Sequence, residues 1–258
     1  MRKNELASLA AHPWIQRLEF TQSLGSTNDQ ATQLAAEEFL ACPALVWAEE
    51  QTAGRGRGGN RWWSSRGGLM FSVILSGEGS APANWSGYSL TAGLAICEAL
   101  AAEIPAVDFA VKWPNDVYAD GRKICGILIE SPAQARGRLI VGIGVNVNNS
   151  FADAPEELSS TATALCDLDG QQRSLSAVLF EILSRLEHCW QRLAAEGFAA
   201  LREHWQERAS LTGRTVTLQV GRTQHVGRCL GIDADGSLLL HTERGREAFA
   251  AGSVVSFE

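Results

Sequence analysis

The sequence predicts an α+β fold, in which a mixed and mostly antiparallel sheet packs against helices and a small β-barrel follows at the C-terminus. Three observations predict it. Short apolar runs alternate with stretches of helical periodicity, one segment has the pattern of an antiparallel hairpin, and the composition changes near Leu211. We therefore expect two domains, residues 1–210 and residues 211–258.

The first expected element is a helix that opens at Gly25-Ser26-Thr27-Asn28 and runs to Phe39, because hydroxyl and amide side chains there can cap free backbone N–H groups. Apolar runs then predict two strands. A stretch of small and aliphatic residues predicts a helix that packs closely on a sheet. In order, these are strands 44–48 and 69–75 and helix 89–104.

Residues 111–130 are expected to form one hairpin, because Asp120-Gly121 between two apolar runs supplies the positive φ angles of a tight turn. Another strand and two packing helices follow, at 139–147, 175–193 and 197–209. From Gly213 to Glu258, short alternating runs separated by turn residues predict the small barrel.

The composition is that of an ordinary globular chain, and it restricts the partners. Of 258 residues, 45% are hydrophobic and 20% are charged, which excludes disordered and small disulfide-rich proteins. The net charge of −7 argues against DNA or a membrane surface as the main partner. Six cysteines without a CxxC pair, no signal peptide and no apolar run of about 18 residues favour a cytoplasmic protein with reduced thiols.

The strongest local signal is the loop QTAGRGRGGNRW, residues 51–62. Its glycines allow close approach of the backbone to a ligand, and its arginines offer planar, bidentate donors for carboxylate or phosphate oxygens. The loop thus indicates an anion-binding site, although a solvated surface loop would have the same composition. A GxxxxGK[ST] phosphate loop is absent, and the segment does not open a helix as a dinucleotide-binding motif would.

Lysine is rare in this chain, and two of the three lysines fall within the predicted hairpin. Lys112-Trp113-Pro114-Asn115-Asp116 lies on its first arm and Lys123 on its second. A hairpin places its arms side by side, so these charges could gather around a ligand oxygen. A solvent-exposed hairpin with surface ion pairs is the alternative interpretation.

Two further motifs have both a structural and a functional interpretation. The alternate glycines Gly142 and Gly144 remove side chains from one face of an apolar strand, which admits either a packed neighbour or a flat ligand. Ser26-Thr27-Asn28 could cap a helix, bind a polar ring, or do both. The five histidines have no metal-ligand spacing, and no GxSxG motif is present. We expect neither a protein-held metal nor a hydrolase triad.

Taken together and in this order, GSTN, EEQTAGRGRGGNRWWS, VKWPNDVYADGRKICGI and VGIGVNVN resemble the motifs of the biotin protein ligases, which attach biotin to biotin-dependent carboxylases. The resemblance covers roughly residues 18–149, and the C-terminal segment resembles the SH3-like domain of that family. It implies a catalytic fold of the class II aminoacyl-tRNA synthetase and biotin ligase type. Since only some 17 residues precede it, we expect the monofunctional type, without the DNA-binding domain of bifunctional members.

The resemblance also implies a two-step reaction and a role for each motif. Biotin reacts with ATP, accompanied by Mg²⁺, to give biotinyl-5′-adenylate, and a lysine of a carboxyl carrier protein then takes the biotinyl group. The implied catalytic residues are Lys123, Arg55, Arg57 and Asp116. The implied biotin-binding residues are Ser26, Thr27, Asn28, Gln51, Gly54, Arg55, Lys123, Gly126, Gly142 and Gly144. The implied nucleotide-binding residues are Arg57, Arg61, Trp62, Asn115, Lys123 and Asn146.

The chain departs from the family's loop pattern, GRGRxGRxW, at one position. Asn60 stands where the third arginine is usual, and Arg61 follows it. Either Arg61 substitutes after a small shift of the loop, or one phosphate contact is lost and the adenylate is held less tightly.

Two other functions remain open at this point. A lipoate ligase of related fold would use the same apolar slot, but the glycine-rich loop and KWPND resemble the biotin branch more closely. A non-catalytic biotin-binding protein would bind biotin without releasing pyrophosphate, and the presence of Lys123 and Arg55 argues against it. The oligomeric state is also open, with a homodimer as one form.

Overall fold

The computed structural model describes residues 3–76, 85–135, 137–152, 154 and 156–258. The chain divides into two compact units, each built from two segments. The first unit comprises Met1–Ala81 and Gly121–Ser184, and the second comprises Pro82–Asp120 and Arg185–Glu258.

The first unit is built on a mixed sheet, as the sequence predicts. Its strands lie in the order β1 (Arg17–Leu24), β2 (Ala44–Gln51), β3 (Leu69–Leu75), β7 (Leu139–Val145) and β6 (Arg122–Glu130). Strands β1 and β2 are parallel, and the other neighbours are antiparallel. β3 and β7 are buried almost throughout, in agreement with their continuous apolar sequences.

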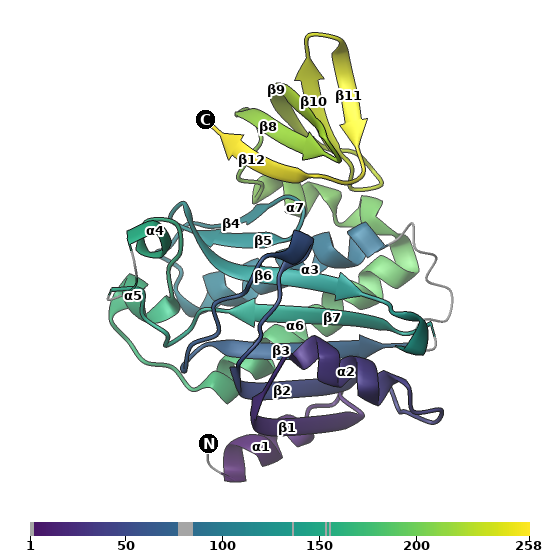
Figure 1. Ribbon diagram of the computed structural model, residues 1–258, viewed down its shortest axis with the longest axis vertical. Coiled ribbons are helices and arrows are strands. Elements are labelled where there is room, and N and C mark those ends of the chain that lie inside the picture. Colours follow the sequence, from purple (N-terminus) through teal and green to yellow (C-terminus); the bar gives the residue numbers. More distant parts are fainter. Residues whose placement is uncertain (1–2, 77–84, 136, 153, 155) are drawn as a thin grey trace. The chain divides into compact units, whose positions relative to one another are not determined.

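Helix α2 (Thr27–Ala35) covers one end of this sheet and packs on β2, β3 and β7, as Figure 1 shows. Small and branched side chains form the contact: Ala31, Leu34 and Ala35 of the helix meet Ala44, Val46, Ile74 and Ile140 of the strands. The strand register places Ser72 and Gly142 on the same face as Ile74 and Ile140, two residues farther along. The sheet face that packs on α2 therefore also presents Ser72 and Gly142.

Several boundaries in this unit differ from the sequence prediction. Helix α2 ends at Ala35, so Phe39 lies outside it and is 92% exposed. The prediction extended the helix because apolar residues continue at helical spacing, but none of the last four residues before Leu40 is buried. Helix α1 (Lys3–Ala10) and strand β1 were not predicted. Strand β1 is partly exposed and mixed in polarity, so it has neither a clear alternation nor an apolar run.

The second unit contains helix α3 (Trp85–Glu103), strands β4 (Phe109–Lys112) and β5 (Asp116–Ala119), and a C-terminal sheet. β4 and β5 are antiparallel, with Lys112 opposite Asp116. The sequence prediction of a single strand across Lys112–Asp116 is therefore wrong. Pro114 has no N–H group and a fixed φ, so the strand breaks there and the chain turns back. The predicted turn after β5 is confirmed, because Asp120 and Gly121 have φ angles of 46° and 77°.

The C-terminal sheet has five antiparallel strands in the order β11-β10-β9-β8-β12. They are β8 (Thr215–Val220), β9 (Thr223–Ile232), β10 (Leu238–Thr242), β11 (Gly245–Phe249) and β12 (Ser253–Phe257). The prediction found four of them and missed β11, in which exposed and half-buried residues alternate and only the last is strongly apolar. Trp113 ties the β4–β5 connection to this sheet, since its Nε1 donates to the Gly236 carbonyl at 3.0 Å.

The remaining helices are α4 (Glu156–Ser159) and α5 (Leu165–Asp169) in the first unit, α6 (Leu175–Glu196), which extends through both units, and α7 (Arg202–Glu207) in the second. The predicted helix 197–209 is wrong in extent, because a short 3-10 turn at Phe198–Ala200 precedes α7. Among the described residues, no helix is both long and apolar enough to cross a lipid bilayer.

Candidate active site

Gln51, at the end of β2, caps the start of helix α2. Its Oε1 accepts a hydrogen bond from the Thr27 backbone N–H at 2.7 Å and another from the Thr27 hydroxyl at 3.1 Å. The side chain of Ser26, the residue at the N-cap position, makes no capping bond. Gln51 Nε2 donates to Ser64 Oγ at 3.0 Å, beyond the glycine-rich loop. The predicted residues Thr27 and Gln51 are thus brought together, with Gln51 in the capping role expected of Ser26.

Asn28 is the buried centre of a second polar group. Ser72 Oγ lies 2.7 Å from Asn28 Oδ1 and 2.8 Å from Thr27 Oγ1. Asn28 Nδ2 donates to Glu130 Oε2 at 2.7 Å. A Cβ atom on Gly142 would come within 2.1 Å of Asn28 Oδ1. Gly142 therefore makes room for Asn28 in this structure, whereas the resemblance assigned that space to the ligand's ring system.

The glycine-rich loop is a short hairpin of its own. The Gly56 N–H donates to the Asn60 carbonyl at 2.7 Å, and the Trp62 N–H donates to the Gly54 carbonyl at 3.0 Å. Gly58, with a φ of 65°, allows the tight reversal between the two arms. Asn60 and Arg61, the region of the departure from the family pattern, lie on the returning arm with exposed side chains.

The returning arm lays the Trp62 ring on a floor of glycines. Gly126 of β6 pairs with Gly144 of β7, and both face the indole. A Cβ atom would lie 3.0 Å from the ring at Gly126 and 2.5 Å from it at Gly144, so the ring fits only because both positions lack side chains. The Lys123 ammonium is 5.7 Å from the ring centroid, within cation–π range.

Arg55 points away from this floor, toward two carboxylates. Its Nη1 and Nη2 each lie 2.8 Å from an oxygen of Glu130, and Nη2 lies 2.7 Å from Asp29 Oδ1. The hydrogen bonds with Glu130 are the main reason that the pKa of Arg55 lies above its ordinary value. Lys123 and Glu130 stand near opposite ends of β6. At about 3.3 Å per residue, their Cα atoms are roughly 23 Å apart. The structure therefore does not bring the Arg55 guanidinium and the Lys123 ammonium together.

Asn146 is almost fully buried, and its side chain holds the neighbouring backbone. Its Nδ2 donates to the Thr163 carbonyl at 3.0 Å, and its Oδ1 accepts from Asn149 Nδ2 at 3.0 Å. The Lys123 carbonyl accepts from the Thr163 N–H at 3.0 Å, which fixes the same segment beside β6. In this structure Asn146 supports the backbone near Lys123, and a direct nucleotide contact would require these bonds to change.

Asn115 and Asp116 belong to the second unit, where they flank the start of β5. Beside them, the Lys112 ammonium lies 3.1 Å from Tyr118 Oη and 5.0 Å from the Phe257 ring centroid. Burial lowers the pKa of Lys112, and the nearby Asp116 carboxylate opposes that shift.

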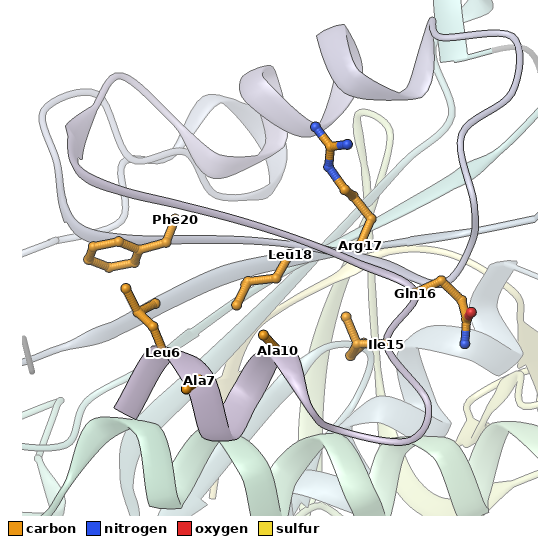
Figure 2. A pocket seen from close by; sticks show the side chains of 8 residues that line it. All are labelled: Leu6, Ala7, Ala10, Ile15, Gln16, Arg17, Leu18 and Phe20. Carbon is orange, nitrogen blue, oxygen red and sulfur yellow. The ribbon is translucent and has the colours of Figure 1, made fainter. Parts of the chain in front are cut away.

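The first unit has a hollow beside the Arg55 ion pairs and another between α1 and β1. A cavity of about 330 Å³ adjoins the Arg55 ion pairs and is lined by Asp29, Thr32, Gln33, Arg55, Glu130, Pro132 and Gln134. A groove of about 460 Å³ runs between α1 and β1, where Leu6, Ile15 and Leu18 line it (Figure 2). The groove contains no residue of the predicted site. Within the described part of the chain, no three His, Cys, Asp or Glu side chains lie together as a metal site.

Sequence reasoning missed the residues that hold the predicted ones in place. Ser72 is the single polar residue of LMFSVIL, and its isolation in a buried strand was the available signal. Glu130 ends the strand RKICGILIE, and Asp29 follows the GSTN motif. Nothing in the sequence pairs these two carboxylates with Arg55, because the three residues come from segments far apart in the chain.

Two family models match parts of this chain. Residues 20–148 match the model of the biotin/lipoate A/B protein ligase family, and residues 212–255 match the biotin protein ligase C-terminal domain. A biotin--[acetyl-CoA-carboxylase] ligase of Paracoccus denitrificans is 35% identical over 89% of this chain and 96% of its own. A bifunctional ligase/repressor of Bacillus subtilis is 34% identical over 89% of this chain and 71% of its own.

A solved structure agrees as well. The biotin protein ligase from Aquifex aeolicus in complex with biotin and ATP superposes with a TM-score of 0.83 and 31% identity, covering 95% of this chain and 99% of that one. The family model, the C-terminal model and these full-length similarities all indicate the same family. The chain belongs to the biotin/lipoate A/B protein ligase family, and within it to the biotin protein ligases.

Proposed function

We propose that this protein activates biotin with ATP and transfers the biotinyl group to a lysine of a biotin carboxyl carrier domain. The observation that carries the proposal is the glycine floor at Gly126 and Gly144, roofed by Trp62 and flanked by the Lys123 ammonium. The indole fills this space in the structure. Once it lifts from the glycines, it leaves a flat, apolar slot that ends at a fixed cation, which suits a bicyclic ring with an acidic tail. The biotin and ATP bound to the Aquifex aeolicus relative support the same assignment.

In the first step, a biotin carboxylate oxygen attacks the α-phosphorus of ATP. A mixed anhydride bond forms, the bond from the α-phosphorus to the bridging oxygen breaks, and pyrophosphate leaves with that electron pair. Two anions must approach each other, so a fixed cation at their meeting point lowers the barrier. Lys123 suits this role, because β6 and the bonds to Thr161 and Thr163 fix its backbone.

The glycine-rich hairpin would close over the intermediate. Its backbone N–H groups and the arginines Arg57 and Arg61 would face the phosphate and nucleotide, and Trp62 would shield the slot from water. Asn115, Asp116 and Asn146 complete the nucleotide side of the proposal, although Asn146 would first have to release its present partners. Thr27, Gln51 and Ser72 would supply the hydrogen-bonding end of the slot for the ureido ring.

In the second step, the neutral amine of the carrier lysine attacks the acyl carbon. An amide bond forms, the bond to the adenylate oxygen breaks, AMP leaves, and the amine gives up one proton. We propose that Asp116 orients this amine or accepts its proton.

The wider assignments follow from the same proposal. MgATP is the nucleotide substrate, with the ion held mainly by phosphate oxygens and water. The carrier belongs to acetyl-CoA carboxylase or a similar enzyme, as the name of the Paracoccus denitrificans relative suggests. All six cysteines are free thiols, which supports a reducing, cytoplasmic compartment. We keep the division into a catalytic domain, 1–210, and an SH3-like domain, 211–258, with a homodimer as one candidate assembly.

Exchange of labelled pyrophosphate into ATP, measured with biotin, with lipoate and without either acid, tests the proposal. Biotin-dependent exchange, followed by labelling of an added carrier domain, is the expected result. Exchange only with lipoate would support the lipoate branch of the family instead. Biotin binding without any exchange would identify a non-catalytic biotin-binding protein.

A further inference from the structure

Glu130 lies at the centre of a chain of contacts that begins under helix α2 and ends in the glycine-rich loop. It accepts two hydrogen bonds from the Arg55 guanidinium, both at 2.8 Å, in the bidentate geometry that gives arginine–carboxylate pairs their directionality. The same carboxylate accepts a third bond from Asn28 Nδ2 at 2.7 Å. The Glu130 side chain is 28% exposed and that of Arg55 is 41% exposed, so solvent screens a considerable part of this ion pair.

Asn28 restrains the orientation of Glu130 because Asn28 is itself buried and hydrogen-bonded on both sides of its amide. It is 3% exposed, and its Oδ1 accepts from Ser72 Oγ at 2.7 Å. Its Nδ2 also donates to the Leu128 carbonyl at 3.3 Å. Gly142 leaves just enough space for its amide, since a Cβ atom there would overlap Oδ1.

Arg55 carries this constraint into the loop. It stands on the outgoing arm of the hairpin, opposite Arg61, and hydrogen bonds from Gly56 and Trp62 link the two arms. Contacts that hold the Arg55 side chain therefore hold the outgoing arm. Through the pairing of the two arms, they also hold the returning arm, which places Trp62 on the glycine floor. Asp29 adds one contact from the outside, but its side chain is 57% exposed.

We infer that Glu130 is a positioning residue, whose carboxylate anchors the glycine-rich loop through Arg55 and so keeps Trp62 seated on the glycine floor. This inference rests on the proposed function for its catalytic consequence, but the anchoring itself does not depend on any reaction. It also gives Arg55 a different role from the one the resemblance implies. In this role the Arg55 guanidinium binds the Glu130 carboxylate of the same chain, not the substrate. Glu130 affects the substrate only through Arg55 and the loop.

Glu130→Gln is the direct test, because the amide keeps the size of the side chain and removes its charge. Amide hydrogen exchange of residues 52–63, followed by mass spectrometry, reports on the loop in the absence of ligand. We expect exchange of the Gly56 and Trp62 amides to become roughly fivefold faster, the scale of a partly exposed ion-pair network. Glu38→Gln is the matched control, since Glu38 is exposed and its side chain takes no part in the loop hydrogen bonds described above.

A double-substitution cycle shows whether the effect passes through Arg55. Arg55→Gln should speed exchange by a similar factor, and combining it with Glu130→Gln should add little more. Additive effects would mean that the two residues act separately, and exchange in Glu130→Gln equal to that of Glu38→Gln would overturn the inference outright. Neither result depends on whether the protein makes an adenylate.

The catalytic consequence has a separate readout. With biotin and ATP present, Glu130→Gln should release the adenylate several times faster than wild type, seen as biotin on an unrelated added protein. Glu130→Asp, which keeps the charge, should restore part of the retention. Faster loop exchange with unchanged retention would overturn the link to the reaction. Absence of adenylate in the wild-type protein would instead overturn the proposed function and leave the anchor in place.

Discussion

Gly144→Ala is the substitution that most directly tests the glycine floor. The added Cβ atom would lie 2.5 Å from Trp62, about 1 Å inside the usual carbon–carbon contact of roughly 3.5 Å. The indole would have to rise from the floor or tilt. Overpacking of this kind typically costs about 1–3 kcal/mol. If that penalty destabilises the closed conformation of the loop, the kcat/KM of biotin-dependent pyrophosphate exchange should fall by roughly 5- to 150-fold.

Gly25→Ala serves as the matched control, because nothing lies within 4 Å of its added Cβ atom. The same change of residue type there should leave exchange within about twofold of wild type. A second comparison isolates the clash itself. In a Trp62→Leu background the ring is gone, so adding Gly144→Ala should reduce the rate little further. Exchange by Gly144→Ala within twofold of wild type would refute the assignment of the floor, and so would a full loss in the Trp62→Leu background.

Other outcomes follow from single side chains. Lys123→Ala should abolish pyrophosphate exchange without lowering the melting temperature, and near-normal exchange would remove Lys123 from its role. Burial lowers the pKa of Lys112 from 10.5, so between the two pKa values the unfolded chain binds more protons than the folded chain. The free energy of unfolding should therefore rise as pH increases toward 10.5. Urea unfolding of Lys112→Met should lack that rise. Trp113→Phe leaves the Gly236 carbonyl without its buried donor and should lower the unfolding free energy by about 1–3 kcal/mol, measured in urea. Burial raises the pKa of Cys97 to about 12, so a thiol reagent at pH 8 should label it only after unfolding; fast labelling of the native protein would contradict this.

Much of the fold was predictable because its signals are local. β3 and β7 are apolar over their whole length, and the turn at Asp120-Gly121 needs the positive φ angles that its residues provide. The break at Pro114 was also readable, since proline disrupts a strand ladder, but the hairpin prediction rested on the Asp120-Gly121 turn and ran its first arm through Pro114. Strand β1 could not be found, because its residues are stabilised by pairing with β2 and carry no pattern of their own.

For the candidate site, the sequence singles out candidate residues but not their partners. The loop, Lys123 and the paired glycines stand out by residue type and order, and the structure brings Trp62 and Lys123 together over Gly126 and Gly144. The partner of Arg55 could not be deduced. An arginine among glycines indicates that an anion binds there. Only the tertiary contacts reveal that this anion is the protein's own Glu130 carboxylate.

A floor built from glycines also sets a direction for any engineering of acyl specificity. The surface at positions 126 and 144 already has the smallest side chain available, so every substitution there adds volume and can only narrow the range of acids accepted. A wider range has to come from the opposite wall. Trp62 is the residue whose trimming would enlarge the space, at the expense of the cover that we propose for the reactive intermediate.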